Sequence, residues 1–170
     1  MLDSIYQFLG SPATYAWLLT VLCVLVIAWD MKAYIIPNWI NAVILLAFIP
    51  AAYFMKIYPV NPLIAFAVVL GFGLLIYAVG FMGGGDVKLI AVLSLWTGLS
   101  TATITFIAYT AMLGGVLMIF LWLSRIIVRL FWKRNVPLLL TKGAPAPYGV
   151  AIATAFIMML HQGRVPVLPV

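Results

Sequence analysis

The stretch LIAFAVVLGFGLLIYAVGFM, residues 63–82, contains no charged side chain and decides the class of fold. A helix needs about 20 consecutive apolar residues to cross the hydrocarbon core of a bilayer. The stretch shows no alternation of polar and apolar residues, which argues against a half-buried strand. Because a backbone in lipid must satisfy its own amides, we expect this segment to be a transmembrane helix.

The rest of the chain has the same character. Of its 170 residues, 67% are hydrophobic and 7% are charged, which leaves too little polar material to cover a water-soluble domain. Residues 87–123 carry one charge, Lys88, and are too long for one crossing, so residues 97–101 are expected to divide them. Other apolar segments predict spans at residues 12–29, 39–55 and 148–160. We therefore expect an all-α, polytopic integral membrane protein with about six transmembrane helices, forming a single domain over residues 1–170.

Basic residues are distributed unevenly between the two ends of the predicted spans. One end carries seven Lys and Arg residues, five of them within residues 124–146, and the other end carries Lys56 and Arg164. The positive-inside rule makes the seven-charge end cytoplasmic. We expect a multi-pass protein of the inner membrane with both termini outside the cytoplasm. Topology explains the net charge of +6, and no nucleic-acid-binding motif accompanies it.

Three acidic residues occur in the chain, and the predicted topology brings two of them, Asp30 and Asp86, to the cytoplasmic face. The span from Asp86 to Ser100 is roughly 22 Å long, shorter than the roughly 30 Å of the hydrocarbon core. Asp86 is therefore expected below the membrane surface, where an ionisable side chain needs a partner or a water-filled cavity. Asp30 is the acidic partner on that face. Two close carboxylates do not both ionise easily, so one can activate a water while the other protonates a carbonyl.

Three glycines, Gly83, Gly84 and Gly85, immediately precede Asp86. A backbone without Cβ atoms allows a substrate strand to approach closely. The simpler interpretation is that the glycines unwind the chain between two spans. Their position beside a membrane-face aspartate favours the first interpretation.

Other side chains are weaker candidates for shaping a site. Lys32 and Lys88 each follow an aspartate by two positions and are interpreted as reaching lipid headgroups or an acidic substrate residue. Tyr148 is either a hydrogen-bond donor near the site or a member of the interfacial aromatic belt. Cys23 is the only cysteine and His161 the only histidine. The sequence therefore predicts no metal site and no cofactor.

Three motifs, in this order along the chain, resemble the prepilin peptidases of the GxGD intramembrane aspartyl protease family. They are DMK at residues 30–32 with IPN at 36–38, GGGDVKL at 83–89, and PYGVAI at 147–152. The similarity covers residues 29–153 and is closest to the compact members that serve tight-adherence (Flp) pili. Within the first motif, Asn38 is also expected to cap the following helix.

The resemblance implies a six-helix protease that cleaves the leader of type IV or Flp prepilins at the cytoplasmic face. It implies that Asp30 and Asp86 are the catalytic aspartates, and that the partners are prepilin substrates and the lipid bilayer. Large members of the family also methylate the new N-terminus with a cysteine-bearing cytoplasmic domain. This chain has no room for that domain and has only Cys23, so peptidase activity is expected and methylation is left open.

Other functions stay open at this point. An archaeal-type preflagellin peptidase would use the same two aspartates. A proton-coupled transporter or channel component would use them as a proton relay, although the sequence has no inverted repeat. An inactive scaffold protein would need neither aspartate.

Reporter fusions test the predicted topology. Fusions after Lys56 and at the C-terminus are expected to read as non-cytoplasmic, and fusions within residues 124–146 as cytoplasmic. The reason is the location of seven of the nine basic residues at one end of the spans. A periplasmic signal from residues 124–146 would overturn the topology and the location of the aspartates with it.

Overall fold

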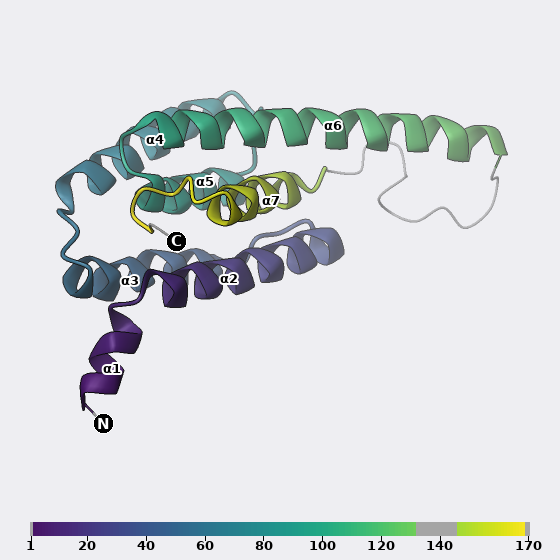
Figure 1. The fold of residues 1–170 in the computed structure, drawn as a ribbon. Coiled ribbons are helices and arrows are strands. Elements are labelled where there is room, and N and C mark those ends of the chain that lie inside the picture. The colour runs from purple at the N-terminus through teal and green to yellow at the C-terminus, as the bar shows by residue number, and fades with distance from the viewer. Residues whose placement is uncertain (1, 132–145, 169–170) are drawn as a thin grey trace.

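The computed structural model describes residues 2–131 and 146–168, and these residues form helices without any strand (Figure 1). The helices are α1 (Leu2–Leu9), α2 (Pro12–Ala33), α3 (Asn38–Phe54), α4 (Val60–Ala78), α5 (Gly84–Thr97), α6 (Thr101–Phe131) and α7 (Tyr148–His161). Helix α1 was not among the predicted elements, and it projects away from the other helices. The six helices after α1 coincide in position with the six predicted spans.

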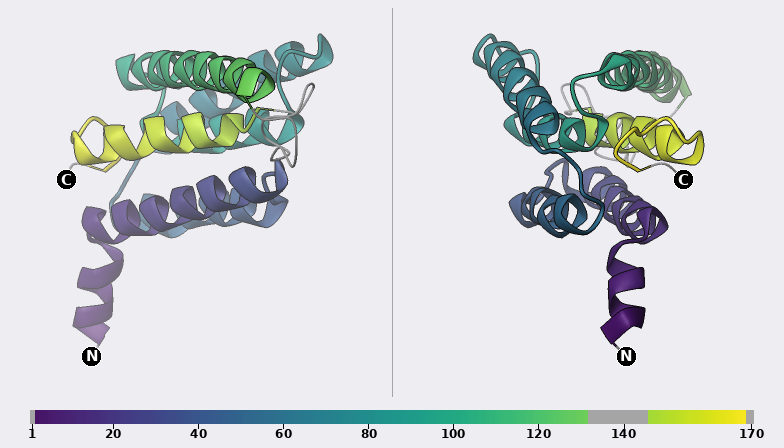
Figure 2. Two further views of the ribbon diagram at one scale, coloured as in Figure 1. Left: turned by 90° about the vertical axis from the view of Figure 1, so that its right-hand side faces the viewer. Right: turned by 60° about the vertical axis from the view of Figure 1, so that its left-hand side comes forward.

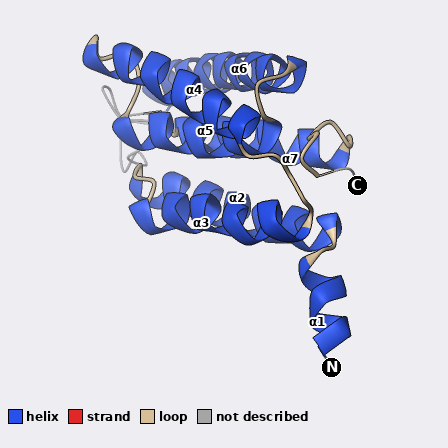
Figure 3. Cartoon of the chain, turned by 90° about the vertical axis from the view of Figure 1, so that its left-hand side faces the viewer, coloured by secondary structure: helices blue, strands red, loops and turns tan. Residues whose placement is uncertain are grey.

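These six helices form three layers of two (Figures 1, 2 and 3). The pair α2 and α3 forms one outer layer, α4 and α6 form the other, and α5 and α7 lie between them. In the middle layer, α5 contacts α3 and α4, and α7 contacts α2 and α6. The shortest two of the six helices are therefore the most enclosed.

The core of the bundle is centred on α5. Every residue of this helix from Ala91 to Thr97 is buried. The Trp96 ring is fully buried and packs edge-to-face on Phe48 of α3, with ring centroids 5.4 Å apart. Its indole N–H donates a hydrogen bond to the carbonyl oxygen of Ile44 at 3.3 Å. These two contacts fix the C-terminal part of α5 against α3, whereas Asp86 lies at the other end of the same helix.

Three helices in the described part of the chain are long and apolar enough to cross a membrane: α2, α4 and the Thr101–Val128 part of α6. The helices α3 and α7 are apolar but shorter. Of the three long helices, α4 is the least buried, with Pro62 and Ala65 as its buried residues. The chain is thus an all-α polytopic membrane protein, in which only three of the six predicted spans reach full crossing length.

The first predicted span was too short. α2 continues to Ala33 instead of ending at Trp29, so Asp30 and Lys32 lie in its last turn and not in a connecting turn. The helix ends because Tyr34 takes a left-handed conformation with φ 54°, and its N–H donates to the carbonyl oxygen of Asp30 at 2.9 Å. A tyrosine carries no sequence signal for this conformation, which glycine or asparagine usually adopts at helix ends.

The third predicted span was too long. α4 ends at Ala78 and not at Met82, because Gly80 adopts a φ of 79° that interrupts the helix. The next helix begins at Gly84. The α4–α5 connection is therefore a short segment with an apolar tip at Phe81, which is 81% exposed.

The predicted division of the long apolar segment is confirmed, since α5 ends at Thr97 and α6 begins at Thr101. Gly98 makes the turn with a φ of 64°. The predicted basic loop at residues 124–146 begins as helix, because α6 continues to Phe131. Three of its basic residues lie outside the described residues: Lys133, Arg134 and Lys142.

Two glycines on α4 provide a matched test of helix packing. A Cβ atom at Gly73 would lie 2.7 Å from Cγ1 of Val87 on α5, whereas a Cβ atom at Gly71 meets nothing within 4 Å. We expect Gly73→Ala to destabilise the protein by about 1–3 kcal/mol through overpacking. Gly71→Ala should leave stability unchanged or slightly higher. Thermal unfolding in detergent measures both, and equal midpoints would contradict the α4–α5 packing.

Candidate active site

Asp30 and Asp86 lie at the same end of the bundle, in the last turn of α2 and the first turn of α5. The Asp30 side chain is 4% exposed, and Asp86 is half-buried. Both border one cavity of about 680 Å³, and their carboxylates interact electrostatically. The other walls of the cavity come from the α2–α3 connection, the α4–α5 connection and the start of α7. The fold thus brings together two acids that are distant in sequence.

Asp86 is held by the first turn of its own helix. Gly83 is the N-cap residue of α5 in an extended conformation, and Asp86 is the third helical residue. The carboxylate folds back to accept a hydrogen bond from the backbone amide of Gly83, as an acidic residue at this position does in a capping box. A Cβ atom on Gly83 would lie 2.9 Å from Oδ2 of Asp86. A side chain at position 83 would therefore crowd the carboxylate in its present position.

The other two glycines pack against neighbouring elements. Both belong to the first turn of α5, so the interpretation that they unwind the chain is wrong. A Cβ atom on Gly84 would lie 3.4 Å from the ring of Tyr77, and one on Gly85 would lie 3.4 Å from Cβ of Ile36. The missing side chain of Gly85 lets α5 begin close to the α2–α3 connection, and this brings Asp86 toward Asp30.

The carboxylate of Asp30 meets the first turn of α7. Its Oδ2 accepts a hydrogen bond from the backbone N–H of Val150 at 3.2 Å, and the backbone amide of Gly149 also donates to the carboxylate. Unpaired N–H groups at a helix N-terminus favour negative charge. The sequence analysis assigned no role to either residue. Although both belong to the third motif, nothing in it indicates a partner 120 residues away.

The remaining predicted site residues divide into two groups. Tyr148 borders the cavity, whereas Lys32 and Lys88 are exposed and are not part of its wall. The Nζ atom of Lys88 donates to Oδ1 of Asn38 at 3.1 Å. The prediction that Asn38 caps α3 is wrong, because Pro37 occupies the N-cap position in an extended conformation and Asn38 is the first helical residue.

The structure adds residues that the sequence did not single out. Tyr34, with its left-handed backbone, and Ile36 both line the cavity. Asn41 lies one turn into α3 and is 5% exposed, and neither of its amide atoms has a hydrogen-bond partner among the described residues. A buried unpaired amide is rare in proteins. The pattern of apolar and polar residues gave no signal for these roles, because each depends on contacts between helices.

The depth and chemistry of the cavity suit hydrolysis. α5 has 14 residues and is therefore about 21 Å long, shorter than the roughly 30 Å hydrocarbon core. A carboxylate at its start lies below the surface unless the bilayer adapts. Two interacting carboxylates titrate as a pair, so one retains a proton that the other has lost. This arrangement supplies a general base and a general acid within one cavity.

The sequence model of the type IV leader peptidase family matches residues 17–119. The chain belongs to this family. Type IV leader peptidases are proteases, and the matched region contains both aspartates and the three glycines. It ends within α6, before the α7 residues that contact Asp30. No curated protein and no solved structure matches the chain.

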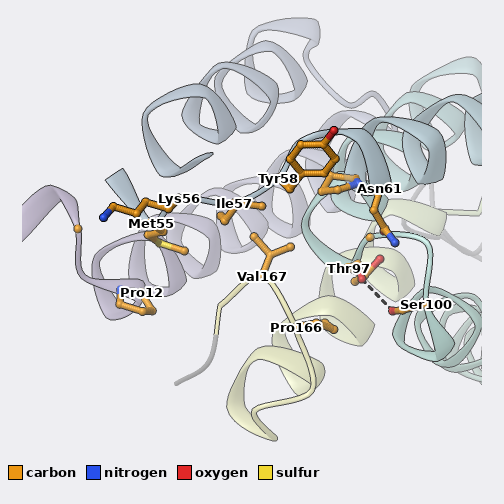
Figure 4. Close-up of a pocket in the computed structure, with 13 residues that line it drawn as sticks. Pro12, Met55, Lys56, Ile57, Tyr58, Asn61, Thr97, Ser100, Pro166 and Val167 are labelled. Atoms are coloured by element: carbon orange, nitrogen blue, oxygen red, sulfur yellow. Dashed lines mark hydrogen bonds between the residues drawn. The ribbon is translucent and has the colours of Figure 1, made fainter. Parts of the chain in front are cut away.

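A second cavity of this leader peptidase family member, of about 610 Å³, lies at the opposite end of the bundle (Figure 4). Its walls include the α3–α4 connection with Lys56, the α5–α6 connection with Ser100, and the C-terminal segment with Val167. No carboxylate side chain borders it, and Lys56 is its charged group. The acid pair of the peptidase is therefore confined to the first cavity.

Metal dependence is open to a direct test. Within residues 2–131 and 146–168, no group of three or more His, Cys, Asp or Glu residues could hold a metal ion, and Cys23 is buried. We expect chelators and thiol reagents to leave the rate of leader cleavage unchanged. Loss of cleavage in a chelator, with recovery on adding zinc, would reveal a metal site and contradict the expectation.

Proposed function

We propose that this chain is an intramembrane aspartyl endopeptidase that removes the leader peptides of type IV or Flp prepilins. Cleavage takes place at the cytoplasmic face of the inner membrane, with Asp30 and Asp86 as the catalytic residues. One observation carries the proposal: the two acids of a type IV leader peptidase family member border the same cavity at one end of its helical bundle. The whole chain acts as a single membrane-embedded peptidase domain.

The proposed reaction uses the two carboxylates in complementary states. The ionised carboxylate takes a proton from a water molecule, whose oxygen attacks the carbonyl carbon of the scissile peptide bond. The protonated carboxyl group gives its proton to the carbonyl oxygen, which produces a neutral diol. The C–N bond then breaks as the first carboxyl group protonates the leaving nitrogen and the second takes a proton back from the diol. The pair returns to its starting state without a cofactor.

The neighbouring residues have supporting roles in this proposal. Gly83, Gly84 and Gly85 shape the site, because Gly83 leaves room for the carboxylate of Asp86, and the other two lie against Tyr77 and Ile36. Tyr148 provides a hydroxyl group at the cavity wall for a substrate backbone. Lys32 and Lys88 lie outside the wall, where their ammonium groups reach lipid headgroups or an acidic residue of the prepilin.

The cytoplasmic location rests on the distribution of charge. Asp30 and Asp86 lie at the end of the bundle toward which α6 extends with Arg125. This is the end with seven of the nine basic residues in the six-span topology. A proton-relay function is less well supported, because a relay needs ionisable groups along a path across the membrane. Here both acids border one cavity at one end.

Removing either carboxylate tests the mechanism. Asp30→Asn and Asp86→Asn should each lower prepilin cleavage by at least about a hundredfold, because an amide can neither accept the proton of water nor donate one to the carbonyl. Asp→Glu at either position should also cleave poorly, since an added methylene displaces the carboxyl group by more than catalytic geometry tolerates. The measurement is the size shift of a co-expressed prepilin, with the amount of inserted protein determined in parallel.

Asp3→Asn is the matched control and should cleave normally, because it removes the third acid of the chain without touching the pair. Near-normal cleavage by either the Asp30 or the Asp86 amide variant would refute the aspartyl mechanism. Cleavage that persists with both variants and also in cells without this protein would favour a scaffold function. Loss of proton flux with intact leader processing would favour a transporter.

A further inference from the structure

Gly149, the second residue of α7, is buried beside the carboxylate of Asp30. A Cβ atom at this position would lie 2.8 Å from Oδ2 of Asp30 and 2.9 Å from Cδ1 of Ile36. Both separations are shorter than Cβ atoms tolerate. The carboxylate is the movable end of its side chain, so an added methyl group would displace the carboxylate before it displaced a helix.

The missing side chain lets backbone N–H groups of α7 reach the carboxylate. Val150 donates to Oδ2 of Asp30 at 3.2 Å, and the amide of Gly149 is a second donor. The first N–H groups of a helix have no partner within that helix and carry the positive end of its dipole. Hydrogen bonds to an ionised acceptor are roughly twice as strong as those between neutral groups. These donors therefore stabilise the ionised form of Asp30 in one orientation.

The carboxylate of Asp30 depends on donors from a different helix, whereas the carboxylate of Asp86 has a donor beside its own helix. Asp30 lies in the last turn of α2, where the dipole of its own helix disfavours a negative charge. Asp86 lies in the first turn of α5 and receives a hydrogen bond from that turn. Among the described residues, the titratable side chains of the cavity wall are the two aspartates, Tyr34 and Tyr148, and none of these is basic. In this part of the chain, the first turn of α7 is thus the positive group that touches Asp30.

We infer that Gly149 is a positioning residue, which allows α7 to hold the Asp30 carboxylate in the orientation that water activation requires. The inference rests on the proposed function. It extends the site to α7, which lies outside the region that the family model matches. It also predicts that changes at residue 149 act on the chemical step and not on substrate binding.

The test compares two glycine substitutions in the full-length protein, reconstituted in lipid with a purified prepilin. Gly149→Ala should lower kcat by about a hundredfold with little change in KM, which is the effect of displacing a catalytic group by about an ångström. Gly115→Ala in α6 is the control, because a Cβ atom there meets nothing within 4 Å. It should cleave like the unmodified protein. Equal kcat values for the two variants would overturn the inference.

A second pair of variants separates catalysis from packing. If the added methyl group acted only by pushing on Cδ1 of Ile36, then Ile36→Val, which removes that atom, would restore activity to Gly149→Ala. We expect the double variant to stay as far below Ile36→Val alone as Gly149→Ala is below the unmodified protein. Restoration by Ile36→Val would show a packing role and overturn the inference.

Val150→Pro keeps the test decisive if Gly149→Ala fails to fold. Proline is tolerated in the first turn of a helix. It adds no atom at residue 149 and removes the N–H group that donates both to Asp30 and to the carbonyl oxygen of Pro147, each at 3.2 Å. A similar loss of kcat is expected, and normal kcat would overturn the inference.

Asp30→Asn is assayed alongside to separate the positioning role of Gly149 from the proposed peptidase function. Cleavage by the unmodified protein and none by Asp30→Asn, with normal rates for the α7 variants, would refute the positioning role alone. Absence of cleavage by the unmodified protein would refute the proposed function itself.

Discussion

Ile36 lies between two glycines, and the rest of the site depends on that arrangement. On one side, Gly85 lets the first turn of α5 approach its Cβ atom, and on the other, Gly149 lets the first turn of α7 approach its Cδ1 atom. Asp86 follows the first glycine directly, and the second lies against Asp30. A single buried side chain in the α2–α3 connection thus lies against two helix N-termini, each of them beside one of the two carboxylates.

Within residues 2–131 and 146–168, the groups that hold the two acids are backbone amides and not basic side chains. The Gly83 amide donates to Asp86, and the amides of Gly149 and Val150 donate to Asp30. A lysine or arginine in the cavity would pair with a carboxylate and weaken its basicity. Backbone donors orient a carboxylate while leaving it free to exchange protons with water. The glycines are needed because these amides must approach closer than a side chain would allow.

Simple patterns in the sequence predicted most of the helices but only part of the candidate site. Apolar runs located the six main helices, because helix formation in lipid is nearly obligatory. The ends of α2 and α4 were missed, since Tyr34 ends its helix without a glycine signal and Gly80 lies inside an apolar run. The two acids could be chosen because the chain has just three. The contact of Asp30 with Val150 could not be predicted, because it depends on how α2 packs against α7.

The two helices of the middle layer, α5 and α7, have 14 residues each, and their length has a consequence for the membrane. A helix of about 21 Å in a core of roughly 30 Å creates a hydrophobic mismatch, which a bilayer relieves by thinning. The longer neighbours α2, α4 and α6 surround these short helices. Because these longer helices separate the short ones from most of the lipid, the missing length is expected to be filled by water that enters from the end of the bundle that carries the acids. The thickness of the bilayer is thus expected to affect how readily water reaches the two aspartates.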